Sequence, residues 1–206
     1  RDIVPARADA ALPAADIGLS SRASICYTSG TTGHPKGAVL TQRAVLLNTL
    51  MTALMHGRSA DDVVVSALPC PHVYGNVVMN SAIACGMTLA LFPRFDEDVV
   101  LDAIVRHRAT LLEGVPTMYM RLLNHASIGR AGLSSLRRCT VGGQTMPVAT
   151  MQEVERRFGC PLLEQGVVLL VLLDDDDALA PGEEILGELV PLASQAAHHH
   201  VAGEPA

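Results

Sequence analysis

The stretch YTSGTTGHPKG, residues 27 to 37, combines five hydroxyl side chains, three glycines and one lysine. Glycines let the backbone approach an anion closely, and successive N–H groups in such a turn form an anion-binding nest. The hydroxyl groups add hydrogen-bond donors, and Lys36 adds a mobile positive charge. The composition therefore predicts a loop that binds a polyphosphate. Its spacing matches neither the Walker loop nor the G-x-G-x-x-G dinucleotide fingerprint.

The flanks of this loop predict regular structure. Residues 24–27 (SICY) are typical of a short buried strand, and residues 38–40 of a second strand. Thr41 is placed to cap a helix that continues to His56. A glycine-rich turn that leaves a strand is a common setting for phosphate sites in α/β folds.

Short apolar runs alternate with helical patterns in the rest of the chain. Strands are expected at 63–67, 87–92, 110–115, 137–141 and 160–164. Helices are expected from 73 to a glycine stop at 86, from 96 to 107, from Pro116 onward, and from 147 to 158. This alternation predicts an α/β fold with a mainly parallel sheet covered by helices. Ligands of such sheets bind at the carboxyl ends of the strands.

Composition excludes several classes of function. The net charge of −6 and the lack of a basic stripe argue against nucleic acid as a partner. Residues 73–93 are uncharged and long enough to span a membrane, but Asn76, Asn80 and Ser81 interrupt them, so we expect a buried helix and strand instead. The five scattered cysteines, without a C-x-x-C pair, indicate reduced thiols in the cytoplasm. The sequence carries no indication of the oligomeric state.

The residues of the glycine-rich loop closely resemble the phosphate-loop signature of the AMP-forming adenylating enzymes. That family includes acyl-CoA synthetases, luciferases and the adenylation domains of peptide synthetases. The resemblance implies that the chain forms part of the large N-terminal domain of that fold. It implies ATP as substrate, Mg²⁺ as its companion and coenzyme A as co-substrate. It also implies catalytic roles for Lys36 and Thr32, and nucleotide binding by Thr28, Ser29, Gly30, Thr31, Thr32, Gly33 and Lys36.

The stretch LPCPHVYG, residues 68–75, resembles the family's LP-x-x-H-x-x-G segment beside the substrate carboxylate. Taken alone, it reads as a rigid connector whose histidine faces solvent. The resemblance instead implies that His72, Tyr74 and Gly75 contact the substrate. No aspartate lies between Asp62 and Asp96, where amino-acid-activating relatives place one to hold an ammonium group. An amino-acid substrate is therefore disfavoured.

Two later segments extend the resemblance. VPTMYMRLL, residues 115–123, is similar to the family's VPT segment, which implies that Thr117 reaches the acyl group. VGGQTMP, residues 141–147, is similar to the glycine turn that lies against the adenine, and so implies nucleotide binding by Gly142, Gly143 and Gln144. A strand–turn–helix connector would use the same residues. Few aromatic residues are present, so adenine stacking would fall to Tyr27, Tyr74, Tyr119 or a backbone plane.

The match changes after Glu164. No YG-x-TE motif follows, so the family's threonine and magnesium-binding glutamate have no counterpart, and neither do its TGD aspartate and its distal lysine, since Lys36 is the only lysine. The acidic run at 174–177 indicates a solvated turn, and the histidines at 198–200 resemble a tag remnant, so no metal-ligating residue is expected. We expect a linker or the end of a preceding region at 1–22, an AMP-binding core at 23–165 and a divergent tail at 166–206.

The function expected from this resemblance is that of an AMP-forming carboxylate–CoA ligase. Such an enzyme activates a carboxylic acid, here a fatty or other apolar acid, through an acyl adenylate. Two alternatives stay open. The first alternative is a non-catalytic or incomplete ATP-binding fragment of such an enzyme. The second is an adenylation domain that loads a carrier protein.

Overall fold

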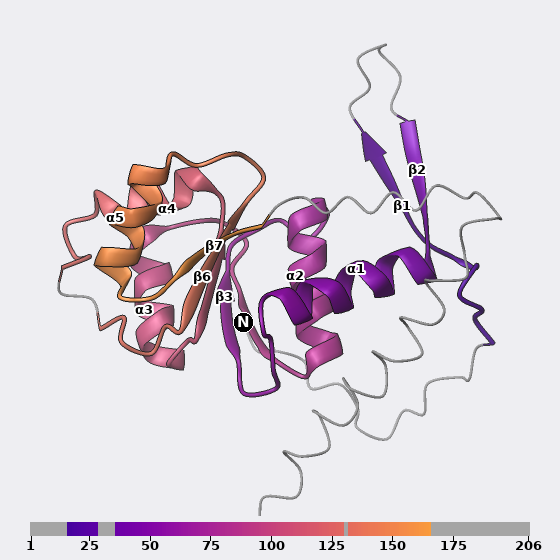
Figure 1. Ribbon diagram of the computed structural model, residues 1–206, viewed down its shortest axis with the longest axis horizontal. Coiled ribbons are helices and arrows are strands. Elements are labelled where there is room, and N and C mark those ends of the chain that lie inside the picture. Colours follow the sequence, from indigo (N-terminus) through magenta and orange to yellow (C-terminus); the bar gives the residue numbers. More distant parts are fainter. Residues whose placement is uncertain (1–15, 29–35, 130–131, 166–206) are drawn as a thin grey trace, which may run out of the picture. The chain divides into compact units, whose positions relative to one another are not determined.

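The computed structural model describes residues 16–28, 36–129 and 132–165 (Figure 1). These residues belong to two compact units, of which the first ends at Arg43 and the second begins at Ala44. Residues 29–35, which hold most of the predicted phosphate loop, and the tail from 166 onward lie outside the described residues.

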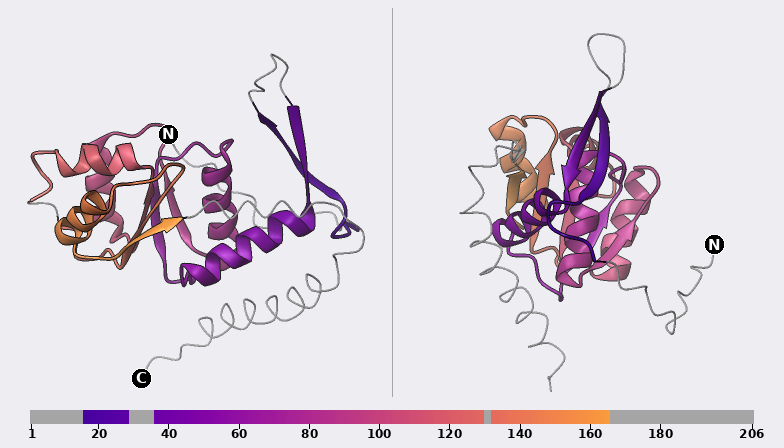
Figure 2. Two further views of the ribbon diagram at one scale, coloured as in Figure 1. Left: turned by 45° about the horizontal axis from the view of Figure 1, so that its top comes forward. Right: turned by 90° about the vertical axis from the view of Figure 1, so that its right-hand side faces the viewer.

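The first unit is built on an antiparallel ribbon of two strands, β1 (Arg22–Thr28) and β2 (Lys36–Thr41). Figure 2 shows the ribbon from two further directions, with its strands side by side. The connection of residues 29–35 is too short for a parallel crossover, which needs a dozen residues or more, so the two strands form a hairpin. Thr41 ends β2, and helix α1 (Gln42–Met55) follows directly, within one residue of the expected limits.

The expectation of a buried strand at 24–27 is wrong. The side chains of Ile25 and Tyr27 are 53% and 73% exposed. The apolar pattern of this segment indicates a strand but cannot tell whether a second layer covers it. Within its own unit the strand pairs with β2 alone, so its side chains stand on an open ribbon.

The second unit contains a five-stranded parallel sheet, which confirms the predicted fold class. Its strand order is β4-β3-β5-β6-β7. The strands are β3 (Val63–Ser66), β4 (Thr88–Leu91), β5 (Leu111–Gly114), β6 (Arg138–Gly142) and β7 (Leu162–Gln165). β4 was expected to be buried, but its residues are exposed or half-buried because it forms an edge of the sheet.

Helices cover both faces of this sheet (Figure 1). Helix α2 (Val73–Cys85) lies on one face, and α3 (Glu97–His107), α4 (Pro116–Leu123) and α5 (Val148–Phe158) lie on the other. Successive side chains of a strand alternate between the faces. Leu111 of β5 accordingly packs with α2, whereas Leu112 packs in the larger core with α3, α4 and α5. The same alternation places the next residue, Glu113, on the α2 face.

Local signals set the helix ends as the sequence predicts. Asp96 caps α3 by accepting a hydrogen bond from the Val99 N–H at 3.0 Å. Gly86 ends α2 in the left-handed conformation, with φ of 68°. Pro116 opens α4 at a position where its missing N–H costs nothing. In the described part of the chain, every helix is too short or too polar to cross a membrane.

A buried carboxylate joins the amino ends of three adjacent strands. Asp62, just before β3, accepts hydrogen bonds from Thr110 Oγ1 at 2.6 Å, Arg137 Nη2 at 2.5 Å and Arg138 Nη2 at 3.2 Å. Thr110 precedes β5, and Arg138 begins β6. Burial by itself would raise the pKa of Asp62, but the hydrogen bonds from Thr110, Arg137 and the Ser59 N–H, with the charge of Arg137, hold it below its usual value.

Acid should destabilise this unit in two steps. Burial, together with the charges of Arg58 and Arg138, lowers the pKa of His56 from 6.5 to about 4. Between these values the unfolded chain binds a proton that the folded chain does not, so stability falls as the pH drops, by at most about 3 kcal/mol. Asp62, whose pKa is lowered, contributes stability that is lost as the pH falls below 3.8.

Urea denaturation across this pH range measures both steps. His56→Gln should flatten the dependence between pH 6.5 and 4 and leave the lower step in place. His107→Gln, at an exposed position near the end of α3, is the matched control and should retain both steps. An unchanged upper step in His56→Gln would refute this assignment.

Candidate active site

The predicted site segments of the second unit gather at one edge of the sheet. The neighbouring strands β3, β5 and β6 run parallel, so the segments that follow them leave from the same edge. These segments carry His72, Thr117 and Gly142–Gln144. A Cβ atom at Gly143 would lie 3.5 Å from Val115 Cγ1, which places the turn after β6 against the segment after β5. Polar side chains and open backbone thus converge where parallel α/β sheets bind ligands.

His72 is exposed and caps the amino end of α2. Its Nδ1 accepts a hydrogen bond from the Tyr74 N–H at 3.3 Å. An imidazole nitrogen that accepts such a bond carries no proton, so the neutral ring has its proton on Nε2. Any hydrogen bond from this ring to a ligand must therefore come from Nε2.

Two substitutions at His72 separate capping from ligand contact. His72→Ala removes the cap and should lower the free energy of unfolding by about 1 kcal/mol. His72→Asn keeps a capping oxygen and should retain most of that stability, while it removes the Nε2–H donor. If both variants lose carboxylate-dependent activity equally, the ring contacts substrate. Activity retained in His72→Asn would show that the cap alone matters.

Gly75 lies in a contact that leaves no room for a side chain. A Cβ atom there would stand 2.2 Å from the carbonyl oxygen of Pro69, well inside any real contact distance. The glycine thus lets α2 approach the backbone of the preceding segment, which is a packing reason for the motif. Its expected contact with substrate stays a prediction.

Tyr74 is buried, with 5% of its surface exposed. Its hydroxyl lies 3.2 Å from Glu113 Oε2, to which it donates, and 2.9 Å from Thr140 Oγ1. Burial and the negative charge of Glu113 raise the pKa of Tyr74 well above its usual value, so the phenol stays protonated. Tyr119 is fully buried as well, and its hydroxyl bonds to the Leu112 and Thr140 carbonyl oxygens. Neither ring is presented for stacking on an adenine.

Glu113 is a buried charge that the sequence reasoning missed. Its Oε1 accepts a hydrogen bond from Arg58 Nη2 at 2.6 Å, and both side chains are fully buried. Its Oε2 accepts one from Thr140 Oγ1 at 2.5 Å. A signal was available, because a glutamate interrupts the otherwise apolar strand at 110–115, and a lone charge in a buried strand requires partners.

Three of the residues expected near the acyl group and adenine, Thr117, Gly143 and Gln144, are accessible. Thr117 is exposed in the first turn of α4. Gly142 is buried at the end of β6, and Gly143 follows with φ of 86°, a conformation that favours glycine. Gly143 and Gln144 are exposed. The turn therefore offers backbone and an amide group to a ligand at the sheet edge.

The predicted phosphate loop is described only at its ends. Thr28, the last residue of β1, pairs with Lys36, the first residue of β2. The expected nucleotide-binding residues Ser29, Gly30, Thr31, Thr32 and Gly33 lie outside the described residues. The ribbon thus brings the backbone at the two ends of the loop together.

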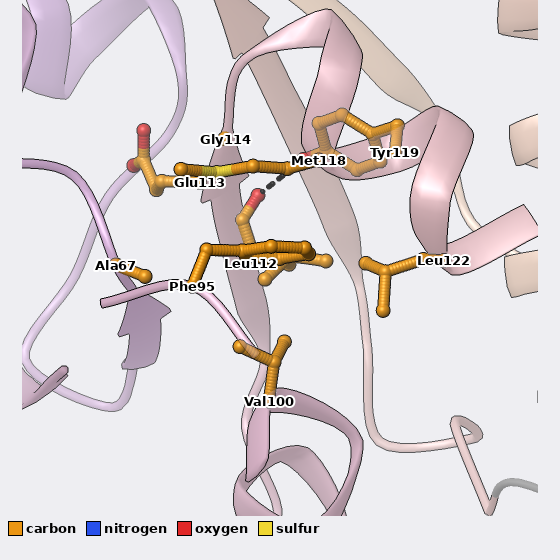
Figure 3. A pocket seen from close by; sticks show the side chains of 9 residues that line it. All are labelled: Ala67, Phe95, Val100, Leu112, Glu113, Gly114, Met118, Tyr119 and Leu122. Atoms are coloured by element: carbon orange, nitrogen blue, oxygen red, sulfur yellow. Dashed lines mark hydrogen bonds between the residues drawn. The ribbon is translucent and has the colours of Figure 1, made fainter. Parts of the chain in front are cut away.

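A small, mainly apolar pocket lies beside the carboxyl end of β5 (Figure 3). Leu112 and Glu113 project to opposite sides of the strand in this view. The pocket's lining includes Phe95, Leu112, Gly114, Met118 and Tyr119. Its volume of about 10 Å³ is close to what a single water molecule requires, so it does not by itself accommodate an acyl chain. Among the described residues, no group of three or more His, Cys, Asp or Glu side chains could hold a metal ion.

Comparison with known proteins agrees with this geometry. The family model described as AMP-binding enzyme matches residues 4–167. An indoleacetate–CoA ligase of Aromatoleum aromaticum is 41% identical over 149 residues, which cover 72% of this chain and 29% of that protein. A long-chain-fatty-acid–CoA ligase of Bacillus subtilis is 39% identical over 141 residues, which cover 67% of this chain and 25% of that protein.

A solved structure shares the fold. The crystal structure of ATP-bound MatB from Rhodopseudomonas palustris superimposes with a TM-score of 0.68 at 35% identity, over 75% of this chain and 30% of that one. The chain spans less than a third of the length of these relatives. The extent of the family match and the parallel sheet with its strand-end turns lead to one conclusion: the chain belongs to the AMP-binding enzyme family.

Proposed function

We propose that this chain is part of an AMP-forming carboxylate–CoA ligase and forms part of its nucleotide-binding and acyl-binding site. The observation that carries the proposal is the gathering of the His72, Thr117 and Gly142–Gln144 segments at one edge of the parallel sheet. Membership of the AMP-binding enzyme family and the similarity to CoA ligases support it.

The proposed reaction has two steps. A carboxylate oxygen of the acid attacks the α-phosphorus of ATP, the bond to the leaving pyrophosphate breaks, and an acyl adenylate forms. The thiol of coenzyme A then attacks the acyl carbonyl, loses its proton and displaces AMP. Both steps depend on orientation of the reactants and on compensation of phosphate charge.

Each predicted residue has a role in the first step. The loop residues Thr28 to Gly33 would donate hydrogen bonds to the β- and γ-phosphates, and Lys36 would compensate their charge. Gly142, Gly143 and Gln144 would hold the adenine by backbone contact and an amide hydrogen bond. His72, Tyr74, Gly75 and Thr117 would shape the acyl side. Mg²⁺, when bound with ATP, would neutralise phosphate charge, but the described residues provide no ligand cluster for it, so no step is assigned to it.

The acid is proposed to be apolar, either a fatty acid or an aromatic acid. The absence of an aspartate between Asp62 and Asp96 removes the partner that an amino group would need. The relatives named above act on indoleacetate and on long-chain fatty acids, both of which carry apolar groups. The five cysteines are free thiols, and the proposal includes a cytoplasmic location, where thiols stay reduced.

ATP–pyrophosphate exchange with a panel of acids tests the proposal. The panel contains fatty, arylacetic and amino acids, and ATP binding is measured alongside by titration calorimetry. Exchange stimulated by a fatty or arylacetic acid supports the ligase. Stimulation by amino acids alone would overturn the substrate assignment, and absence of both exchange and ATP binding would overturn the nucleotide site.

The second candidate is an ATP-binding fragment without catalysis. The missing YG-x-TE motif after Glu164 favours it. ATP binding without exchange under any acid would select this candidate. A domain that loads a carrier protein is the third reading, and His72, where an acidic residue would be expected, weighs against it.

A further inference from the structure

We propose that Glu113 is a positioning residue that holds the acyl-side and adenine-side segments of the site in register. This inference rests on the proposed function. Glu113 is a buried charged residue of the second unit, and the proposed reaction assigns it no role.

The contacts of Glu113 join two neighbouring strands, β5 and β6, to helix α2, which follows β3. Glu113 itself lies in β5, one residue before Gly114 ends that strand. Its Oε2 receives hydrogen bonds from Tyr74, in the first turn of α2, and from Thr140 of β6. The Tyr74 oxygen also lies 2.9 Å from Thr140 Oγ1. Because the Thr140 proton goes to Glu113, the single Tyr74 proton is shared between Glu113 and Thr140, and the three side chains form a triangle.

Two corners of this triangle, Tyr74 and Thr140, lie close in sequence to other predicted site residues. Tyr74 follows His72 by two residues, and its N–H donates to the His72 ring. Thr140 precedes Gly142 by two residues on the same strand. Glu113 therefore connects the His72 segment to the glycine turn through two hydrogen bonds of one carboxylate, without facing the ligand itself.

Arg58 fixes the carboxylate from the other side. Its Nη2 donates to Glu113 Oε1 at 2.6 Å, and in the described residues its Nε and Nη1 are buried without a hydrogen-bond partner. A buried guanidinium with unsatisfied donors is costly to maintain. Apolar side chains in place of Arg58 and Glu113 could fill this volume at a lower free-energy cost. We therefore infer that the ion pair is present to orient the Glu113 carboxylate rather than to stabilise the fold.

The opposite edge of the sheet contains a matched structure. Asp62 joins the amino ends of β3, β5 and β6 through hydrogen bonds from Thr110, Arg137 and Arg138. Glu113 plays the corresponding part near the carboxyl ends of β5 and β6. The threonines correspond, because Thr110 Oγ1 donates to Asp62 and Thr140 Oγ1 donates to Glu113. Thr110→Val thus removes a corresponding, partly buried hydrogen bond at the other end of the strands, and it serves as the control for Thr140→Val.

The test compares ligands that contact one side or both sides of the site. AMP contacts only the nucleotide side, whereas indoleacetyl and lauroyl sulfamoyl adenosine, stable analogues of acyl adenylates, contact both. Calorimetric titration of the 206-residue chain measures the ratio of the dissociation constants of AMP and analogue. The variants are Glu113→Gln, Thr140→Val, Thr140→Ser and Thr110→Val, each measured below its unfolding temperature.

Glu113→Gln and Thr140→Val should reduce the ratio of the AMP to the analogue dissociation constant by about tenfold or more. A displacement of the acyl-side residues by a fraction of an ångström would remove the contribution of their contacts to analogue binding. AMP affinity alone should change far less. Thr140→Ser, which restores the hydroxyl, should recover the ratio, and Thr110→Val should leave it unchanged. Thr140→Val decides the matter if Glu113→Gln does not fold.

An unchanged ratio in Thr140→Val would overturn the positioning role. An equal loss in Thr110→Val would also overturn it, because any weakened core would then have the same effect. A wild-type chain that binds neither AMP nor the analogues would instead refute the proposed nucleotide site, and the positioning role with it. The wild-type titration thus separates the two failures.

Discussion

Replacing Lys36 with alanine is expected to lower carboxylate-dependent ATP–pyrophosphate exchange by roughly 10²–10³-fold, or about 2.7–4 kcal/mol of barrier. Lys36 is the only lysine of the chain and stands at the start of β2, opposite Thr28 across the ribbon. In the proposed reaction, the positive charge of Lys36 would compensate the negative charge that pyrophosphate acquires as it leaves. The effect should appear in the maximal rate, because this charge develops in the transition state.

Two control variants show whether the loss is specific. Lys36→Arg keeps the charge but changes its geometry, so it should retain part of the activity. Arg106→Ala removes an exposed cation of α3 that pairs with Asp102, and it should leave the exchange rate unchanged. Full exchange activity in Lys36→Ala would remove Lys36 from the proposed machinery.

Glu113→Ala is expected to lower the free energy of unfolding by about 3–5 kcal/mol. The substitution leaves the Arg58 guanidinium buried without a counter-charge, since its contact with His56 is to a ring whose lowered pKa of about 4 keeps it neutral. It also removes the acceptor of the Thr140 hydroxyl. Denaturant unfolding followed by circular dichroism measures the change.

A double variant tests the cause of this loss. Arg58→Met combined with Glu113→Leu removes both charges, and such replacements are often neutral or stabilising. It should therefore recover most of the stability that Glu113→Ala loses. Asp102→Ala, which breaks the exposed pair with Arg106, is the surface control and should change stability little. A double variant as unstable as Glu113→Ala would show that the packing volume, rather than the unpaired charge, sets the cost.

The sequence predicts the architecture of the parallel sheet well, because local chemistry determines it. Asp96 caps a helix with an acidic first turn, Gly86 takes a left-handed conformation and Pro116 starts a helix, and each of these depends only on near neighbours. The prediction that the strand at 24–27 is buried was wrong, because burial depends on distant parts of the chain rather than on near neighbours. Whether Ile25 and Tyr27 are covered depends on a second layer, which a four-residue apolar pattern does not report.

The site is predicted in its parts but not in its connections. Motifs indicate His72 and the Gly142–Gln144 turn as candidate site residues, and the sheet order then brings their segments to one edge. The triangle of Tyr74, Glu113 and Thr140 could not be identified from motifs, because its members are separated by 27 and 39 residues and meet only through strand register. The motif predicts that Tyr74 contacts the substrate, but it does not indicate that the Tyr74 hydroxyl lies against Glu113 and Thr140.

Oxygen transfer from the acid to AMP tests the central claim most directly. The chain is incubated with ATP, coenzyme A and an apolar carboxylic acid whose two oxygens are ¹⁸O, and the products are analysed by mass spectrometry. Attack of the carboxylate on the α-phosphorus predicts one labelled oxygen in AMP and none in pyrophosphate. Unlabelled AMP, or label in phosphate with ADP as the nucleotide product, would contradict activation of the acid as an adenylate.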